Sequence, residues 1–185
     1  MTQREYDYFM LMKKNESSNV DSPSQQHEEI NGVVTYFFND NFGYLPDVGS
    51  EVYVLPEKFR ARSTDVSVYC LQITMGAIAK TIPGIQDAIQ SKMMTNADFD
   101  SLCLRVKRFI EDLRSERFPD IQKTVAKGDG SFSVRAKPGK YFLIVRSAHL
   151  DFVSSNVERM GQIDIDETTV KINQARSVNF KFKPR

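Results

Sequence analysis

The sequence contains only two cysteines and two histidines, the residue types that most often supply a catalytic nucleophile with its base or the ligands of zinc. Cys70 and Cys103 fall on the apolar stripes of two expected helices, where a free cysteine typically acts as a small core residue. A disulfide between them is the alternative, and it requires Cα atoms within about 7 Å and an oxidising compartment. Neither His27 nor His149 has a second histidine or cysteine at metal-ligand spacing. We therefore expect no catalytic residue, no metal site and no cofactor.

The oxygen-rich side chains form two groups, residues 39–41 with Asp47 and residues 164–167. A calcium ion takes about six to eight oxygen ligands, and the first group lacks the glycine and glutamate spacing of an EF-hand loop. Asp164 and Asp166 share one face of an alternating strand, which is the usual pattern of a solvated face. Residues 128–130 (Gly-Asp-Gly) lack the lysine of a phosphate-binding loop and predict a tight hairpin turn.

The elements that would position these residues are mainly strands. Alternating or continuous apolar patterns predict seven strands, at residues 32–38, 51–55, 121–127, 131–136, 141–147, 161–172 and 176–183. Residues 57–118 change to helical periodicity. One stripe runs through Val66, Tyr69, Cys70, Ile73 and Ala77, and a second helix, Ala97–Arg117, has a stripe made by Phe99, Leu102, Cys103, Val106, Ile110 and Leu113. A short helix is also expected around residues 85–94. This pattern predicts a mainly β fold, a seven-stranded antiparallel sandwich with a helical insertion between its second and third strands.

Three of the strands, at residues 32–38, 51–55 and 141–147, are apolar on both faces. A strand with two apolar faces needs cover on both sides, and the helical insertion has apolar stripes to bury. We therefore expect the helices to pack on the outside of one sheet that holds all three strands.

The turn sequences resemble those of the carboxypeptidase regulatory-like domains. The resemblance covers about residues 30–56 and 120–183 and rests on Gly32-x-Val34, Pro46-Asp47-x-Gly49-Ser50-x-Val52, Thr124-x-x-x-Gly128-Asp129-Gly130-x-Phe132 and Pro138-Gly139-Lys140-Tyr141, in that order. It implies a transthyretin-like (prealbumin-like) sandwich that acts as an accessory or interaction module without catalytic residues. Lys127 stands where the family often has an acidic residue, which weakens the expectation of a cation at that turn.

The candidate binding residues lie in the loop at residues 39–50. Most aromatic residues fall on strands and helix stripes, whereas Phe42 and Tyr44 lie in this loop together with Asp47. The leading hypothesis is a non-enzymatic interaction or structural module that contacts a protein partner. The alternative is a module that binds a carbohydrate or another small ligand, with Phe42 and Tyr44 lining a groove. An enzyme would require a polar cluster in a pocket between the helices and the sheet.

Charge and hydropathy narrow the class of partner. The 185 residues include 25 basic and 24 acidic side chains, which argues against a nucleic-acid binder. No apolar run approaches the roughly 18 residues of a membrane span, and the first residues do not follow the pattern of a signal peptide. Taken at face value this indicates a cytoplasmic protein, or one of the cell envelope or secreted if the chain is a fragment. Residues 1–29 predict a disordered tail, in which residues 6–12 form a loose or partner-binding segment, and residues 30–183 predict a single domain.

Overall fold

The computed structural model describes residues 28–82, 88–89, 92–154, 157–171 and 174–183. The strands are β1 (Glu28–Asn39), β2 (Gly43–Pro46), β3 (Glu51–Pro56), β4 (Gln122–Val125), β5 (Ser131–Ala136), β6 (Gly139–Ser154), β7 (Val157–Val170) and β8 (Arg176–Phe182). A 3-10 turn, η1 (Glu57–Phe59), leads into the helices α2 (Arg60–Thr81) and α4 (Asn96–Arg114). Of the tail expected at residues 1–29, Glu28 and Glu29 belong to β1, and residues 1–27 lie outside the described part.

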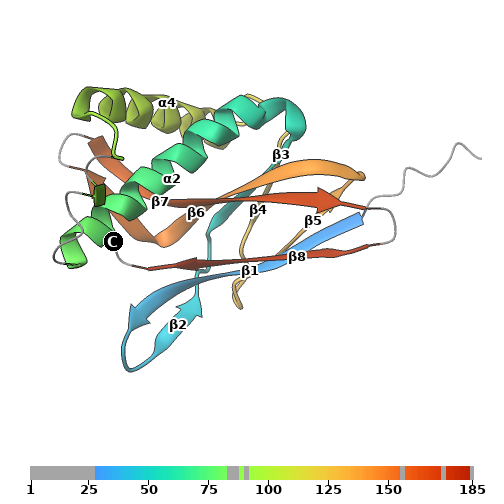
Figure 1. The fold of residues 1–185 in the computed structure, drawn as a ribbon. Coiled ribbons are helices and arrows are strands. Elements are labelled where there is room, and N and C mark those ends of the chain that lie inside the picture. The colour runs from blue at the N-terminus through green and yellow to red at the C-terminus, as the bar shows by residue number, and fades with distance from the viewer. Residues whose placement is uncertain (1–27, 83–87, 90–91, 155–156, 172–173, 184–185) are drawn as a thin grey trace, which may run out of the picture.

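The strands form two four-stranded sheets that pack against each other (Figure 1). In sheet A, β1 is the central strand and pairs with β8 along one of its edges. Along its other edge, β1 pairs first with β5 and then with β2. Sheet B has the order β4-β3-β6-β7. The core between the sheets consists of inward-facing residues of both, including Val34, Phe132, Val145 and Phe180. The chain is thus mainly β, with its helices between β3 and β4, as the sequence predicts.

The described residues contain eight strands, one more than expected. The additional strand is β2, which lies within the segment that the sequence predicts as a loop. It pairs antiparallel with the end of β1, with Phe37 opposite Tyr44, and so forms a hairpin at one end of sheet A. Asn39 closes this hairpin because its side-chain oxygen accepts the backbone N–H groups of Asn41 and Phe42, each at 3.0 Å.

The helices cover the outer face of sheet B. The expectation that β1 lies in the same sheet as β3 and β6 is wrong. A second core lies between α2, α4 and the sheet face that carries Tyr53, Leu55, Phe142 and Ile144. β1 is instead in sheet A, on the far side of the molecule from the helices (Figure 1). Its inner face packs on sheet B. On its other face, Phe37 contacts Tyr44 of the hairpin, whereas Val33 is 37% exposed.

The segments at residues 121–127 and 131–136 do not form the predicted hairpin. β4 pairs with β3 in sheet B, whereas β5 pairs with β1 in sheet A. The turn between them therefore crosses from one sheet to the other. It is closed by the backbone N–H of Gly130, which donates to the carbonyl of Lys127 at 2.8 Å, and Gly130 has a φ of 77° that favours glycine.

The helical stripes agree with their prediction, but the helix ends differ. Val66, Tyr69, Cys70 and Ile73 are buried in α2, and Leu102, Cys103, Val106, Ile110 and Leu113 are buried in α4. Thr95 caps α4 by accepting the backbone N–H of Asp98 at 3.2 Å. The helix ends at Arg114, three residues before the predicted end, because Glu116 takes a φ of 55°. The helix expected at residues 85–94 lies largely outside the described residues.

Candidate binding surface around Asp47 and the aromatic hairpin

Asp47 lies in the turn that carries the chain from sheet A to sheet B. Its backbone N–H donates to the carbonyl of Val34 at 2.9 Å, and its carbonyl accepts the N–H of Ser50 at 3.2 Å. Gly49 has a φ of 86°, and its N–H donates to the carbonyl of Ala126 at 3.0 Å. This turn places the Asp47 side chain inside the protein, where it is fully buried. Asp47 therefore orients neighbouring groups and does not itself face a ligand, unlike the surface candidate that the sequence indicates.

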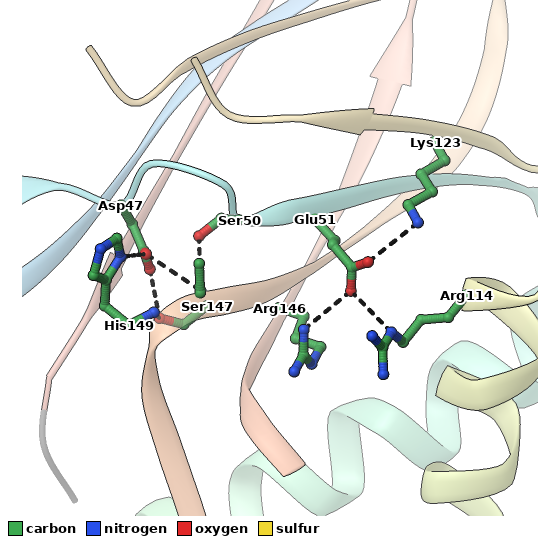
Figure 2. Close-up of polar contacts among 9 residues, drawn as sticks. Asp47, Ser50, Glu51, Arg114, Lys123, Arg146, Ser147 and His149 are labelled. Carbon is green, nitrogen blue, oxygen red and sulfur yellow. Dashed lines mark hydrogen bonds and ion pairs between the residues drawn. The ribbon is translucent and has the colours of Figure 1, made fainter. Parts of the chain in front are cut away.

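The Asp47 carboxylate holds an irregular part of β6. The pairing of β6 with β7 shifts between Arg146 and Asp151, so that residues 147–150 bulge out of the ladder. The carboxylate accepts the hydroxyl of Ser147 and, at 3.2 Å, the backbone N–H of Ala148 (Figure 2). The same N–H lies 3.2 Å from the hydroxyl of Ser50. A bulge leaves ladder groups unpaired, and here the side chains of one turn satisfy them.

The bulge presents His149 to the surface. Its Nδ1 lies 2.6 Å from Oδ1 of Asp47, and its side chain is 41% exposed. A histidine held at Nδ1 by a buried carboxylate is one part of a nucleophilic triad, in which the imidazole would next contact a hydroxyl. Here the Ser147 hydroxyl donates to Asp47 instead. The arrangement therefore fixes the ring of His149 without activating Ser147 as a nucleophile.

His149 begins a continuous series of four rings, which we call the aromatic run: His149, Tyr36, Phe38 and Phe42. The rings of His149 and Tyr36 are stacked, with centroids 4.6 Å apart and an interplanar angle of 1°. Phe38 meets Tyr36 edge to face at 6.4 Å, and Phe42 meets Phe38 in the same way at 6.0 Å. Phe38 is 52% and Phe42 69% exposed, so the outer half of the aromatic run is open to solvent.

Phe42 and Tyr44 do not form one platform. Phe42 contacts Phe38, whereas Tyr44 contacts the ring of Phe37 at 5.6 Å. Phe37 and Phe38 are successive residues of β1, so their side chains point to opposite faces of the strand. Phe42 and Tyr44, which contact them, are therefore associated with opposite faces of the hairpin. The ammonium groups of Lys181 and Lys183, each 5.7 Å from the ring centroid, also lie over Tyr44. A single groove lined by both candidates is therefore not present in this arrangement.

A separate charged centre lies where the end of α4 meets sheet B. The carboxylate of Glu51 accepts Lys123 at 3.1 Å, Arg146 at 3.1 Å and Arg114 at 3.5 Å (Figure 2). Partial burial by itself raises the pKa of Glu51, but the three cations outweigh burial and hold the pKa below its ordinary value of 4.5. Because Arg114 belongs to α4 and the other residues to sheet B, this centre links the helical layer to the sheet.

The Glu51 centre predicts a pH dependence of stability. A carboxylate whose pKa is lowered by folding stabilises the folded state above its unfolded pKa, and this contribution is lost as the pH falls through the folded pKa. We expect Glu51→Gln to lower the free energy of unfolding at neutral pH by about 1–3 kcal/mol, because three cations lose their shared partner. Its unfolding free energy should also depend less on pH below about 4.5. Urea unfolding from pH 7 to pH 3 measures both effects. Glu116→Gln, at an exposed carboxylate, is the control, and equal curves for the two variants would contradict the prediction.

The cysteines and the oxygen-rich groups do not form a site in the described part of the chain. Cys70 and Cys103 are buried and are not joined in a disulfide, and burial raises the pKa of the Cys103 thiol. The Cys70 thiol lies 3.3 Å from the carbonyl of Ile163. Among the described residues, no group of three or more His, Cys, Asp or Glu side chains is placed to hold a metal ion. No described helix is long and apolar enough to cross a membrane.

Comparisons with known proteins give structural likeness alone. No family model and no curated protein matches the sequence. The structure is similar to a Pseudomonas aeruginosa protein provisionally named as carbohydrate binding, at 11% identity and a TM-score of 0.44, covering 90% of this chain and 95% of that one. It is also similar to the pilus backbone protein of Streptococcus pneumoniae, at 13% identity and a TM-score of 0.29, covering 84% of this chain and 41% of that one.

The central pair of this surface could not be read from the sequence. Asp47 and His149 are 102 residues apart, and the sequence places His149 beside Asp151 instead. Tyr36 and Phe38 read as ordinary strand residues. The structure shows that β1 continues beyond Tyr36, which makes the last pair with β8 by lying opposite Phe182, and that this end of β1 pairs with β2 instead.

Proposed function

We propose that this chain is a non-enzymatic binding module of the carboxypeptidase regulatory-like type, with a transthyretin-like arrangement of strands. Its contact surface is the aromatic run, and its partner is a protein with an apolar pocket. The observation that carries the proposal is the exposed pair Phe38 and Phe42 at the end of the β1–β2 hairpin, which extends from one end of sheet A (Figure 1).

The chemistry of the hairpin favours a protein partner. Exposed aromatic side chains are typical anchors of protein interfaces, where one or two rings enter a pocket of the partner. The backbone N–H groups of Asn41 and Phe42 are already used, because the side-chain oxygen of Asn39 accepts both. The inner rings Tyr36 and His149 are fixed by stacking and by Asp47, which reduces the entropy lost on binding.

Two further features support a module without catalysis and of this family. The Ser147 hydroxyl donates to Asp47 and not to His149, so the serine, histidine and carboxylate are not in the order that nucleophilic catalysis needs. The Pro46–Ser50 and Gly128–Phe132 motifs lie where the chain passes between the sheets, and such corners constrain a sequence more than open loops do.

The proposal predicts a position-specific cross-link. With a photoreactive benzoylphenylalanine in place of Phe42, illumination of the native cells should give one protein adduct of defined mass. Phe38→Ser should reduce that adduct about tenfold, because it removes one of two adjoining anchors. It should leave the melting temperature nearly unchanged, because Phe38 is 52% exposed. Mass spectrometry of the adduct identifies the partner.

The matched control places the same photoreactive residue at Leu71, which is 55% exposed on α2. We expect no adduct of the same mass there. The proposal fails if both positions give the same adducts, or if Phe38→Ser does not change the yield. The observations that favour carbohydrate binding, the alternative function, concern a different surface, the outer face of sheet A.

A further inference from the structure

The outer face of sheet A carries a shallow hollow of about 380 Å³. The described helices lie over sheet B, so they do not cover this face (Figure 1). This volume is within the range of small-molecule sites, about 300–1,000 Å³. Six of the residues that line it form two rows across β8, β1 and β5, namely Ser177, Asn31 and Ser133 in the first row, and Asn179, Val33 and Ser131 in the second. The exposed Lys127 also lines the hollow.

Hydrogen bonds fix the polar side chains of the first row. Glu29 lies beside it and accepts the Asn31 side-chain amide at 3.3 Å and the Ser133 hydroxyl at 2.6 Å. These two hydrogen bonds lower the pKa of Glu29, which therefore remains a charged acceptor at neutral pH. Because the NH₂ group of Asn31 faces Glu29, its amide oxygen is directed away from that carboxylate.

The second row has the complementary arrangement. The side-chain oxygen of Asn179 accepts the backbone N–H of Val33 at 3.1 Å. The NH₂ group of Asn179 is thereby directed to the other side of its amide plane. The hollow thus offers an acceptor from Asn31 and a donor from Asn179, with serine hydroxyls that can act as either. Between these polar groups lies Val33, whose side chain is 37% exposed.

The charges and polarity of this surface restrict its ligand. Lys127 lines the hollow and the carboxylate of Glu29 lies beside Asn31, so these two opposite charges together favour neither an anion nor a cation. The five amide and hydroxyl side chains disfavour an apolar molecule. The backbone of β1 is paired on both edges here, with β5 and with β8, so it has no edge to offer a peptide strand. The remaining class is a neutral molecule with neighbouring hydroxyl groups and an apolar C–H face.

We propose that this hollow binds one ring of a neutral saccharide, with the C–H face of the sugar on Val33 and with neighbouring hydroxyls bonded to Asn31 and Asn179. A sugar hydroxyl both donates and accepts, so one vicinal pair satisfies both amides. The site is formed by residues on three strands that the sandwich already holds in register, and it does not include the aromatic run. A negative result for this site would therefore leave the protein contact proposed above unaffected, and the converse also holds.

The test is a two-dimensional NMR titration of the ¹⁵N-labelled protein with glucose, galactose, mannose and N-acetylglucosamine, each alone. At least one sugar should shift the backbone amides of Val33, Ser131 and Ser177 along a saturable curve, whereas glycerol at the same concentration should not. Asn31→Ala should weaken that binding about tenfold, as the loss of one hydrogen bond predicts. Ser177→Phe should abolish it by filling the hollow.

The matched control is Thr35→Ala, on the same strand face but outside the hollow, which should bind as the unchanged protein does. Phe38→Ser should also bind normally, which separates this site from the aromatic run. Three results overturn the proposal: no saturable shift with any of these sugars and no neutral glycan bound on an array, equal shifts with glycerol, or unchanged binding by Asn31→Ala and Ser177→Phe.

Discussion

Replacing Gly32 with alanine is expected to destabilise the folded protein by about 3 kcal/mol or more. A Cβ atom at this position would lie 1.9 Å from the carbonyl oxygen of Val178 and 2.5 Å from the ring of Phe132. Real Cβ atoms do not approach other atoms within 3.0 Å, so something must move. The first obstacle is backbone, and it belongs to the β8 strand that pairs with β1 through this residue. Relief therefore requires a displacement of β8 as well as a new side-chain rotamer.

Gly128→Ala is the matched control for this result. Its φ is not positive, and no atom lies within 4 Å of the added Cβ. Alanine there restricts the unfolded chain, so we expect a gain of up to about 1 kcal/mol. The two variants make the same chemical change with effects of opposite sign, measured by urea unfolding at constant pH. Similar midpoints for both would mean that β8 is not held against β1 in the way described.

The helical layer could be predicted from the sequence because amphipathic periodicity is a local property. The stripe residues from Val66 to Ile73 and from Leu102 to Leu113 are buried as expected, because each helix has one apolar face to bury. The helix ends were less predictable. Serine is a residue type that often caps a helix N-terminus, yet Ser63 is buried within α2, whose first residue is Arg60. Tertiary packing, which a local pattern does not contain, decided this boundary.

The assignment of strands to sheets could not be predicted from the same patterns. The Gly-Asp-Gly turn at residues 128–130 suits a hairpin and a corner between sheets equally well, because both need a short reversal with a positive φ. Which one forms depends on the partners of β4 and β5, and those partners, β3 and β1, are distant in sequence. For the same reason the sequence could not show that Phe42 and Tyr44 contact opposite faces of the hairpin.

The candidate site, like the fold, could be predicted from the sequence only in part. The sequence indicates residues 39–50 as a recognition segment, and that segment does contain the exposed Phe42 and the turn of Asp47. It does not indicate the role of Asp47, which follows from the bulge at residues 147–150. A buried carboxylate is costly unless it is fully hydrogen-bonded, so its burial shows that it organises structure. That reasoning leads to the second large effect.

Asp47→Ala should lower the free energy of unfolding by about 3 kcal/mol, because it leaves the Ser147 hydroxyl without its buried acceptor and the Ala148 N–H with the Ser50 hydroxyl alone. The loss should be concentrated at the bulge. We expect the Ala148 amide hydrogen to exchange with solvent much faster than the amide of Val54 in the centre of sheet B. His149 should also lose its fixed stacking on Tyr36, visible as averaged aromatic NMR shifts.

Asp47→Asn tests whether the carboxylate itself matters, because it keeps the size and one oxygen acceptor of Asp47. Its cost should be smaller than that of alanine, yet clearly larger than that of Asp40→Asn at an exposed position in the hairpin. If Asp47→Asn and Asp40→Asn behave alike, the charge does not hold the bulge. If instead Asp47→Asn exchanges rapidly at Ala148 while the rest of sheet B stays protected, the carboxylate is the group that fixes the base of the aromatic run. Because Phe38 and Phe42 extend from Tyr36, such a variant should also weaken the photo-cross-link without removing any exposed ring.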